Sequence, residues 1–179
     1  MTSDFGTARA IDARAHGQPG GRTFQLRIIG SNNESASLWL EKQQMLALSL
    51  ALTQVLSQLG KPPRTGEDIA SFPDGPDHDF RVGRMAIGFD TANGTVVLHI
   101  FEASHEEEEE GEPDVQVRIT EDACAGLNSR LQEIIAGGRP VCPLCGVPMD
   151  TGGHACIRSN GHSEQPIPHN HTDDEESQP

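Results

Sequence analysis

The sequence predicts an α+β fold in which antiparallel strands carry two helices on one face, followed by a small cysteine-rich appendage. Two windows, residues 22–60 and 80–138, hold most of the large apolar side chains. In each window an alternation of period two, typical of strands, gives way to the spacing of three and four that is typical of an amphipathic helix. Beyond residue 138 lie three of the four cysteines.

The first window predicts a strand, a turn, a second strand and a helix. The first strand starts at residue 23, and its apolar side chains at 24, 26 and 28 share one face. The stretch 30–35, "GSNNES", is rich in turn-forming residues and separates it from a strand that carries Leu38 and Leu40. The helical stripe that follows consists of Met45, Leu48, Leu52, Val55 and Leu59, and Gly60 ends it.

The second window predicts three strands and a helix. "DFRVGRMAIGFD", residues 79–90, indicates a strand, and "TANG" a tight turn before a second strand through residues 96–100. An acidic loop, residues 104–114, leads to a third strand with Val115, Val117 and Ile119. Thr120 is a suitable N-cap for the helix whose stripe is Leu127, Leu131, Ile134 and Ile135.

The two windows match each other at one constant offset. The matched pairs are Leu38 with Val117, Leu40 with Ile119, Met45 with Cys124, Leu48 with Leu127, Leu52 with Leu131, and Val55 with Ile134. This register predicts two strand-strand-strand-helix repeats related by a pseudo-twofold axis, although any strand followed by a helix gives a similar register. The expected organisation is a duplicated α+β domain at 1–138, a zinc-knuckle or ribbon-like appendage at 139–162, and a disordered acidic tail at 163–179.

Composition restricts the partners. The net charge is −14, with two lysines, Lys42 and Lys61, and eleven scattered arginines, so a duplex or an anionic membrane would be repelled. No apolar run reaches the roughly 20 residues that span a bilayer. The start lacks the basic and apolar regions of a signal peptide. We therefore expect a cytoplasmic protein with a protein partner, no nucleic acid and no membrane; the sequence does not define the oligomeric state.

The cysteine-rich segment predicts a zinc site. Cys142-Pro-Leu-Cys145-Gly is the tight turn that places two sulfurs around one ion, and His154-Ala-Cys156 follows after a short loop. Three thiolates and one imidazole are the ligands that a tetrahedral zinc prefers. His162 is the alternative fourth ligand. So short a segment needs a metal to become rigid.

Three other interpretations of the cysteines compete. A redox pair needs a helix N-terminus and a thioredoxin-like context, which the residues around Pro143 and Leu144 lack, and it would leave Cys156 idle. An iron site typically takes four cysteines, but Cys124 lies on the apolar stripe of the second helix and is better explained as a small core residue. The third is a chance arrangement without structure.

The predicted zinc is structural, because a catalytic zinc keeps one position open for water and this set supplies four protein ligands. Asp150 is the one acid inside the loop, and capping the turn explains it better than general-base catalysis. Residues 139–179 carry only two arginines against six acids, which disfavours a DNA-reading finger. The expected function is a non-enzymatic protein-binding or adaptor module. The alternative is a zinc-dependent hydrolase or other enzyme with a pocket at the repeat interface.

Three stretches, "LEKQQ", "FRVGRMAIGFD" and "GRPVCPLCGVPMDTGGHACIRSNGH", resemble in order and spacing the family of uncharacterised proteins known as domain of unknown function 3090, found mainly in Actinobacteria and some Chloroflexi. The similarity covers about residues 20–162. The family pattern, Cys-Pro-x-Cys-Gly and then Gly-His-x-Cys-Pro-Arg-x-Asn-Gly, implicates Cys142, Cys145, His154 and Cys156, and its frequent Tyr at 162 argues against His162. Ile157 departs from the family proline. The resemblance implies zinc and brings no activity.

Overall fold

The computed structural model describes residues 1–60, 71–105 and 111–137, together with Cys142 and Met149. The chain divides into two compact units, Met1–Gly138 and Arg139–Pro179. All the helices and strands described below belong to the first unit. The expected acidic loop lies partly, and the expected tail wholly, outside the described residues.

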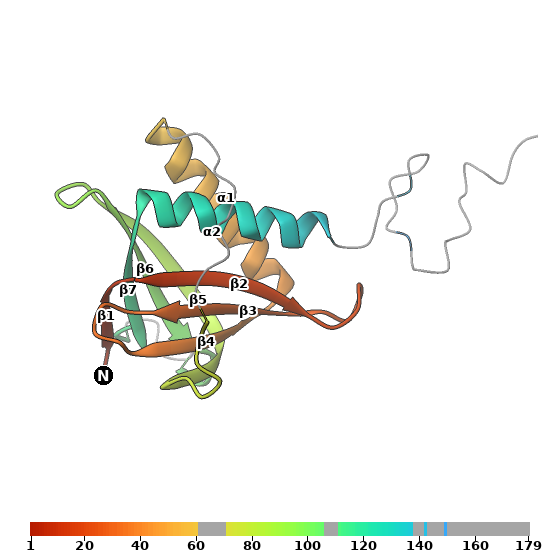
Figure 1. Ribbon diagram of the computed structural model, residues 1–179, viewed down its shortest axis with the longest axis horizontal. Coiled ribbons are helices and arrows are strands. Elements are labelled where there is room, and N and C mark those ends of the chain that lie inside the picture. Colours follow the sequence, from red (N-terminus) through yellow and green to blue (C-terminus); the bar gives the residue numbers. More distant parts are fainter. Residues whose placement is uncertain (61–70, 106–110, 138–141, 143–148, 150–179) are drawn as a thin grey trace, which may run out of the picture. The chain divides into compact units, whose positions relative to one another are not determined.

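Within the described residues, seven strands form one sheet in the order β1-β7-β6-β5-β4-β3-β2, with two helices packed on it (Figure 1). The strands are β1 (Ser3–Thr7), β2 (Ala10–His16), β3 (Thr23–Ile29), β4 (Ser35–Leu40), β5 (His78–Asp90), β6 (Thr95–Glu102) and β7 (Val115–Thr120). The helices are α1 (Lys42–Gln58) and α2 (Glu121–Ala136), with a short 3-10 turn, η1, at Ala103–His105. The α+β class and the strands and helices expected in both windows are confirmed.

The prediction of antiparallel strands is confirmed for four of the six strand pairs of the described residues, but the other two pairs are parallel. β1 pairs with β7 in parallel, and β4 pairs with β5 in parallel. Between β4 and β5 the chain passes through α1, and such a crossover returns the chain to the end of the sheet where β4 began. The next strand therefore runs in the same direction as β4, and the sheet is mixed.

The sequence analysis also missed the first two strands. β2 pairs with β3 over its whole length, and the core-facing side chains of β2 are Ile11, Ala13 and Ala15. Two alanines give a weak apolar alternation, so this stretch resembles a polar terminus when it is examined alone. β1 contributes Phe5, whose side chain is fully buried. Glycine at position 30 lets the Phe5 backbone pack closely against it, because a Cβ on Gly30 would lie 2.4 Å from the Phe5 carbonyl oxygen.

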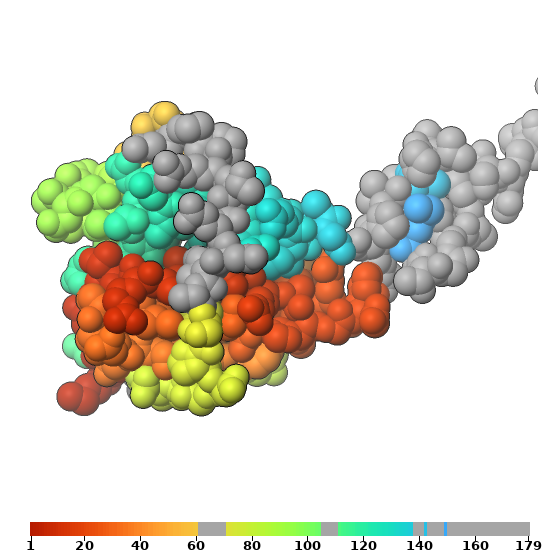
Figure 2. Space-filling view, viewed as in Figure 1, coloured from red at the N-terminus to blue at the C-terminus, as the bar shows by residue number. Residues whose placement is uncertain are grey.

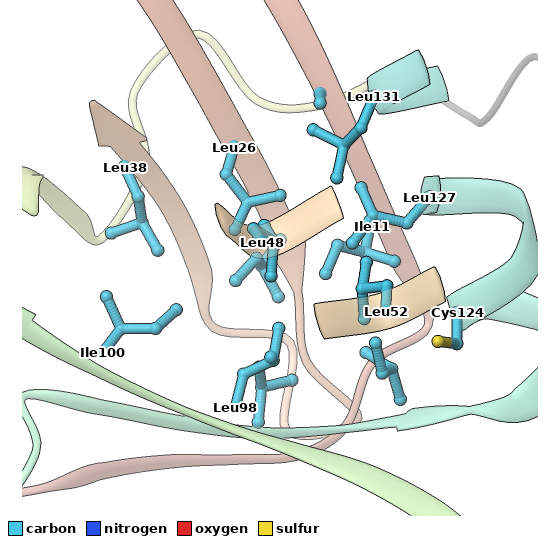
Figure 3. Close-up of a cluster of buried hydrophobic side chains, with 14 of the residues drawn as sticks. Ile11, Leu26, Leu38, Leu48, Leu52, Leu98, Ile100, Cys124, Leu127 and Leu131 are labelled. Atoms are coloured by element: carbon cyan, nitrogen blue, oxygen red, sulfur yellow. The ribbon is translucent and has the colours of Figure 1, made fainter. Parts of the chain in front are cut away.

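Three strands joined in antiparallel fashion and then a helix occur twice along the chain, as β2-β3-β4-α1 and as β5-β6-β7-α2. Side chains from both sets meet in one apolar core between the sheet and the two helices (Figure 3). The matched residues Leu48, Leu52, Leu127 and Leu131 are all buried there. Thr120 caps α2 as predicted, since its hydroxyl accepts a hydrogen bond from the Ala123 amide at 3.2 Å.

The start of α1 is tied to a β-bulge in β5. The Gln44 side chain accepts a hydrogen bond from the Glu41 amide at 2.8 Å, which closes the first turn of the helix. Its amide nitrogen donates to the carbonyl oxygens of Val82 and Gly83 at 2.8 and 2.9 Å, where the β5–β6 register shifts. One side chain thus satisfies backbone groups of a helix end and of a bulge.

The two helices share a buried polar contact at their crossing. The Ser49 hydroxyl of α1 donates to Asn128 Oδ1 of α2 at 3.0 Å, and Asn128 Nδ2 donates to Thr53 Oγ1 at 3.0 Å. Ser49 and Asn128 are both buried. Because polar groups buried without partners are costly, this contact specifies how α1 packs against α2.

We expect Asn128→Ala to lower the free energy of unfolding by about 1–3 kcal/mol, because the buried Ser49 hydroxyl loses its acceptor. Adding Ser49→Ala should cost less than the sum of the single changes, since the orphaned hydroxyl is then removed. Urea unfolding followed by circular dichroism measures both effects. The control is Gln132→Ala, an exposed change on the same helix. Additive single effects would show that the contact does not couple the helices.

Candidate functional site

The predicted zinc ligands fall largely outside the part of the chain that the structure describes. Cys142 is described, and it is buried, with 6% of its surface exposed. Cys145, His154, Cys156 and the alternative ligand His162 lie outside the described residues. Among the described residues no group of three or more His, Cys, Asp or Glu side chains is placed to hold a metal ion. The ligand set therefore stays a prediction from the sequence.

Cys124 has the role that the sequence predicted for it. It lies on α2, is fully buried and belongs to the apolar core. Burial, and secondarily the negative charge of Glu121, raises the pKa of the Cys124 thiol to about 11. The thiol thus stays protonated at neutral pH, and a protonated thiol is a poor nucleophile and a poor metal ligand. Cys124 is a core residue.

The raised pKa of Cys124 predicts a loss of stability at alkaline pH. The unfolded thiol ionises near its ordinary pKa of 9.0 while the folded thiol stays protonated up to about 11. Stabilisation from the neutral thiol is therefore complete below pH 9 and is lost as pH rises towards 11, by up to about 2 kcal/mol. The difference in unfolding free energy between the wild type and Cys124→Ala, measured in urea from pH 8 to 11, should shrink over this range. A constant difference would contradict the assignment.

The described residues also form a surface recess of about 310 Å³ on the sheet face away from the helices. Its floor comes from β2, β3 and β4, and its wall from the segment that precedes and enters β5. In Figure 2 the yellow surface that begins at residue 71 lies against the red and orange surface of the N-terminal strands. The polar and aromatic lining residues include Arg14, Gln25, Arg27, Trp39, Phe72 and Asp79.

Alternation along the strands determines which side chains line the recess. Leu26 and Leu38 are fully buried on the helix-covered face. Since neighbouring side chains in a strand point to opposite faces, Gln25 and Arg27 on β3, and Trp39 on β4, lie on the other face. The strand pairing places these positions side by side, with Gln25 opposite Trp39.

Hydrogen bonds and a ring contact hold the recess wall in place. Asp77 accepts hydrogen bonds from the Ser35 backbone amide at 2.8 Å and from the Ser35 hydroxyl at 2.9 Å. These two bonds lower the pKa of Asp77. The Arg27 guanidinium lies 4.1 Å from the centre of the Phe72 ring, and the Trp39 indole N–H donates to Asp79 at 2.7 Å.

Three arginines converge on one carboxylate beside the recess. Arg27 Nη2 lies 2.7 Å from one oxygen of Asp12, Arg130 Nε lies 3.4 Å from the other oxygen, and Arg14 Nε lies 3.8 Å from the first. Asp12 is buried, whereas the Arg14 side chain is 58% exposed. Arg130 also pairs with Glu133 at 3.0 Å. This cluster connects β2, β3 and α2.

The sequence analysis did not identify the recess. Its residues come from four stretches that are far apart in the chain, and none of these stretches carries a recognisable motif. The available signal was the polar half of the predicted strand at residues 23–29, where Gln25 and Arg27 alternate with apolar residues. That alternation indicates a polar face, but it does not indicate which other segments cover that face.

Comparison with known families identifies the chain. Residues 3–156, most of the sequence, match the family described as "Protein of unknown function (DUF3090)". The chain belongs to the DUF3090 family. No curated protein and no solved structure matches it.

The match to the DUF3090 family includes both candidate sites. The recess residues lie within the matched range, as do Cys142, Cys145, His154 and Cys156, whereas His162 lies beyond it. Among the described residues no helix is long and apolar enough to cross a membrane. Family membership brings no activity, since the description of the family is that its function is unknown.

Proposed function

We propose that this DUF3090 protein is a zinc-stabilised, non-enzymatic binding module whose partner is another protein. The observation that carries the proposal is the closely spaced ligand set Cys142, Cys145, His154 and Cys156. Three thiolates and one imidazole complete a tetrahedral site, and a completed site has no position for a reacting water. When bound, the zinc would supply folding free energy to a segment too short to build a core.

Two further observations support a protein partner. With a net charge of −14, the chain disfavours nucleic acids and anionic membranes. Leu46 and Leu50 of α1 are 39% and 61% exposed. Their spacing of four residues places both on one helix face. Neighbouring exposed leucines on a helix that carries no acidic residue are a suitable contact for an apolar surface of a partner protein.

We further infer that the two strand-strand-strand-helix sets are repeats related by a pseudo-twofold axis. Ser49 and Asn128, which are hydrogen bonded to each other, are separated in the sequence by the same offset as Leu48 and Leu127. Contact between equivalent positions is what a twofold axis between α1 and α2 requires.

A reducing compartment suits closely spaced zinc-binding thiols, so we assign the protein to the cytoplasm.

We expect one zinc per chain in the purified, tag-free protein, measured by plasma mass spectrometry. Cys142→Ser should lose the zinc, because removal of one thiolate opens the site. His154→Ala should lose it as well, while His162→Ala should retain it. The matched control is Cys124→Ser, which leaves the ligand set intact. Absence of zinc from the wild type, with all thiols titratable after unfolding, would refute the zinc site.

The fourth ligand distinguishes the binding module from the enzyme alternative. If His154→Ala retains zinc, then His162 or water completes the coordination. A water ligand would favour the zinc-dependent hydrolase.

The partner proposal predicts that one protein is recovered with the wild-type chain when it is isolated at native abundance from its own cells. Leu46→Ser with Leu50→Ser should reduce its recovery about tenfold, because the apolar contact is removed. Cross-linking followed by mass spectrometry measures the recovery. A matched surface change, Gln132→Ser on α2, should leave it unchanged. No partner for the wild type, or equal recovery with the leucine variant, would contradict the proposal.

A further inference from the structure

α1 presents a face without acidic residues on a strongly acidic protein. Exposed positions recur along the helix at spacings of three and four residues, so they form one continuous stripe opposite the buried residues. The single charged residue of α1 is Lys42, at its first position, although the chain has a net charge of −14. The exposed stripe, called the α1 face below, consists of Gln43, Leu46, Ala47, Leu50, Thr53, Gln54 and Ser57.

α2 differs from α1 on this surface, although each helix follows a set of three strands. At the offset that aligns the two sequence windows, acidic or polar residues of α2 correspond to uncharged residues of the α1 face. The aligned pairs are Gln43 with Asp122, Leu50 with Ser129, and Gln54 with Glu133. Charged side chains keep a solvent-exposed helix soluble, so their absence from the α1 face indicates a surface that another molecule covers.

The centre of the α1 face is apolar and has no need of an ion pair. Leu46 and Leu50 are 39% and 61% exposed. The neighbouring Thr53 hydroxyl is already engaged inside the protein, since it donates to the Ser49 carbonyl oxygen at 2.8 Å and accepts from Asn128 Nδ2 at 3.0 Å. A molecule that covers this face therefore gains from burial of the leucines and separates no charged pair.

A second copy of the chain fits these requirements. In a twofold contact the same surface is present on both sides, so an acidic face would meet its own charge. When two α1 helices run antiparallel with Leu46 of one copy against Leu50 of the other, Lys42 lies level with Gln54 and no like charges meet. Two chains of net charge −14 repel each other, and the α1 face lets them meet without any acidic residue of α1 in the contact.

We propose that a second copy of this chain covers the α1 face, with the two α1 helices antiparallel around a twofold axis. The inference rests on the proposed function in one respect, because both use Leu46 and Leu50. The dimer would keep these leucines covered until a partner protein displaces one copy. A contact made mainly by one helix from each copy is at the small end of protein interfaces, so the dimer should be reversible.

Sedimentation velocity of the purified full chain, from about 1 to about 300 µM, tests the association. The expected result is a monomer–dimer equilibrium with a Kd on the order of 10 µM. Raising the salt concentration from about 0.05 to about 0.5 M should lower the Kd several-fold, because salt screens the repulsion between two acidic chains. A chain that stays monomeric over the whole range would overturn the proposal. A Kd that rises with salt would also overturn it, since ion pairs would then hold the dimer.

The deciding variant is Leu50→Glu, which brings a carboxylate from each copy to the centre of the contact. It should raise the Kd at least about tenfold. Leu50→Gln removes the apolar contact without adding charge and should raise the Kd by a smaller factor. The matched control, Thr91→Glu, adds the same charge in the exposed turn between β5 and β6, and its Kd should equal that of the wild type. Equal urea midpoints would show that the three variants are folded. An unchanged Kd in Leu50→Glu, or an equal rise in both Glu variants, would contradict the proposal.

These outcomes are separate from those that test the proposed function. Association is measured on the purified chain alone, whereas partner recovery uses the protein in its own cells and the zinc is measured by mass spectrometry. A monomeric chain would overturn the dimer and leave the zinc site and the partner protein standing. A dimer that depends on Leu50 would support the inference even if no partner protein were recovered.

Discussion

Burial of one face of the sheet beneath α1 and α2 is the constraint on which the rest of this structure depends. Leu26, Leu38, Leu98 and Val117 from the strands meet Leu52 and Leu131 from the helices in one continuous core (Figure 3). Because both helices lie on the same face, the opposite face is left without a helix among the described residues. The polar side chains that alternate with the core residues along each strand lie on this uncovered face, where core packing does not restrict their type. The recess lies on this face.

Polar groups inside the fold connect elements that the apolar core brings together. Ser49 and Asn128 join the two helices, Gln44 joins the start of α1 to the bulge in β5, and Asp12 joins two strands to α2. Each polar contact satisfies groups whose burial would otherwise be unfavourable. The core supplies most of the stabilisation, while these contacts determine how the elements are aligned.

The four cysteines divide according to their surroundings. Cys124 lies among apolar side chains on α2, where burial keeps its thiol protonated. The other three lie beyond residue 138, where polar composition and close spacing favour metal binding instead. The same side chain thus acts as a small core residue in one place and as a proposed ligand in another. Local hydrophobicity in the sequence predicted the core position of Cys124, which the structure confirms, while the ligand role of the other three stays a prediction.

The sequence alone determined the class, both helices, five of the strands, the Thr120 cap and the burial of Cys124, because each depends on periodicity or chemistry within about 20 residues. The strands β1 and β2 were missed because Ala13 and Ala15 give little apolar contrast, and their place depends on partners elsewhere in the chain. Parallel pairing of β4 with β5 depends on the path of the α1 crossover. The recess joins side chains from residues 14 to 79, and only tertiary structure places Arg14, Trp39 and Phe72 together, because no local pattern encodes which distant strands become neighbours.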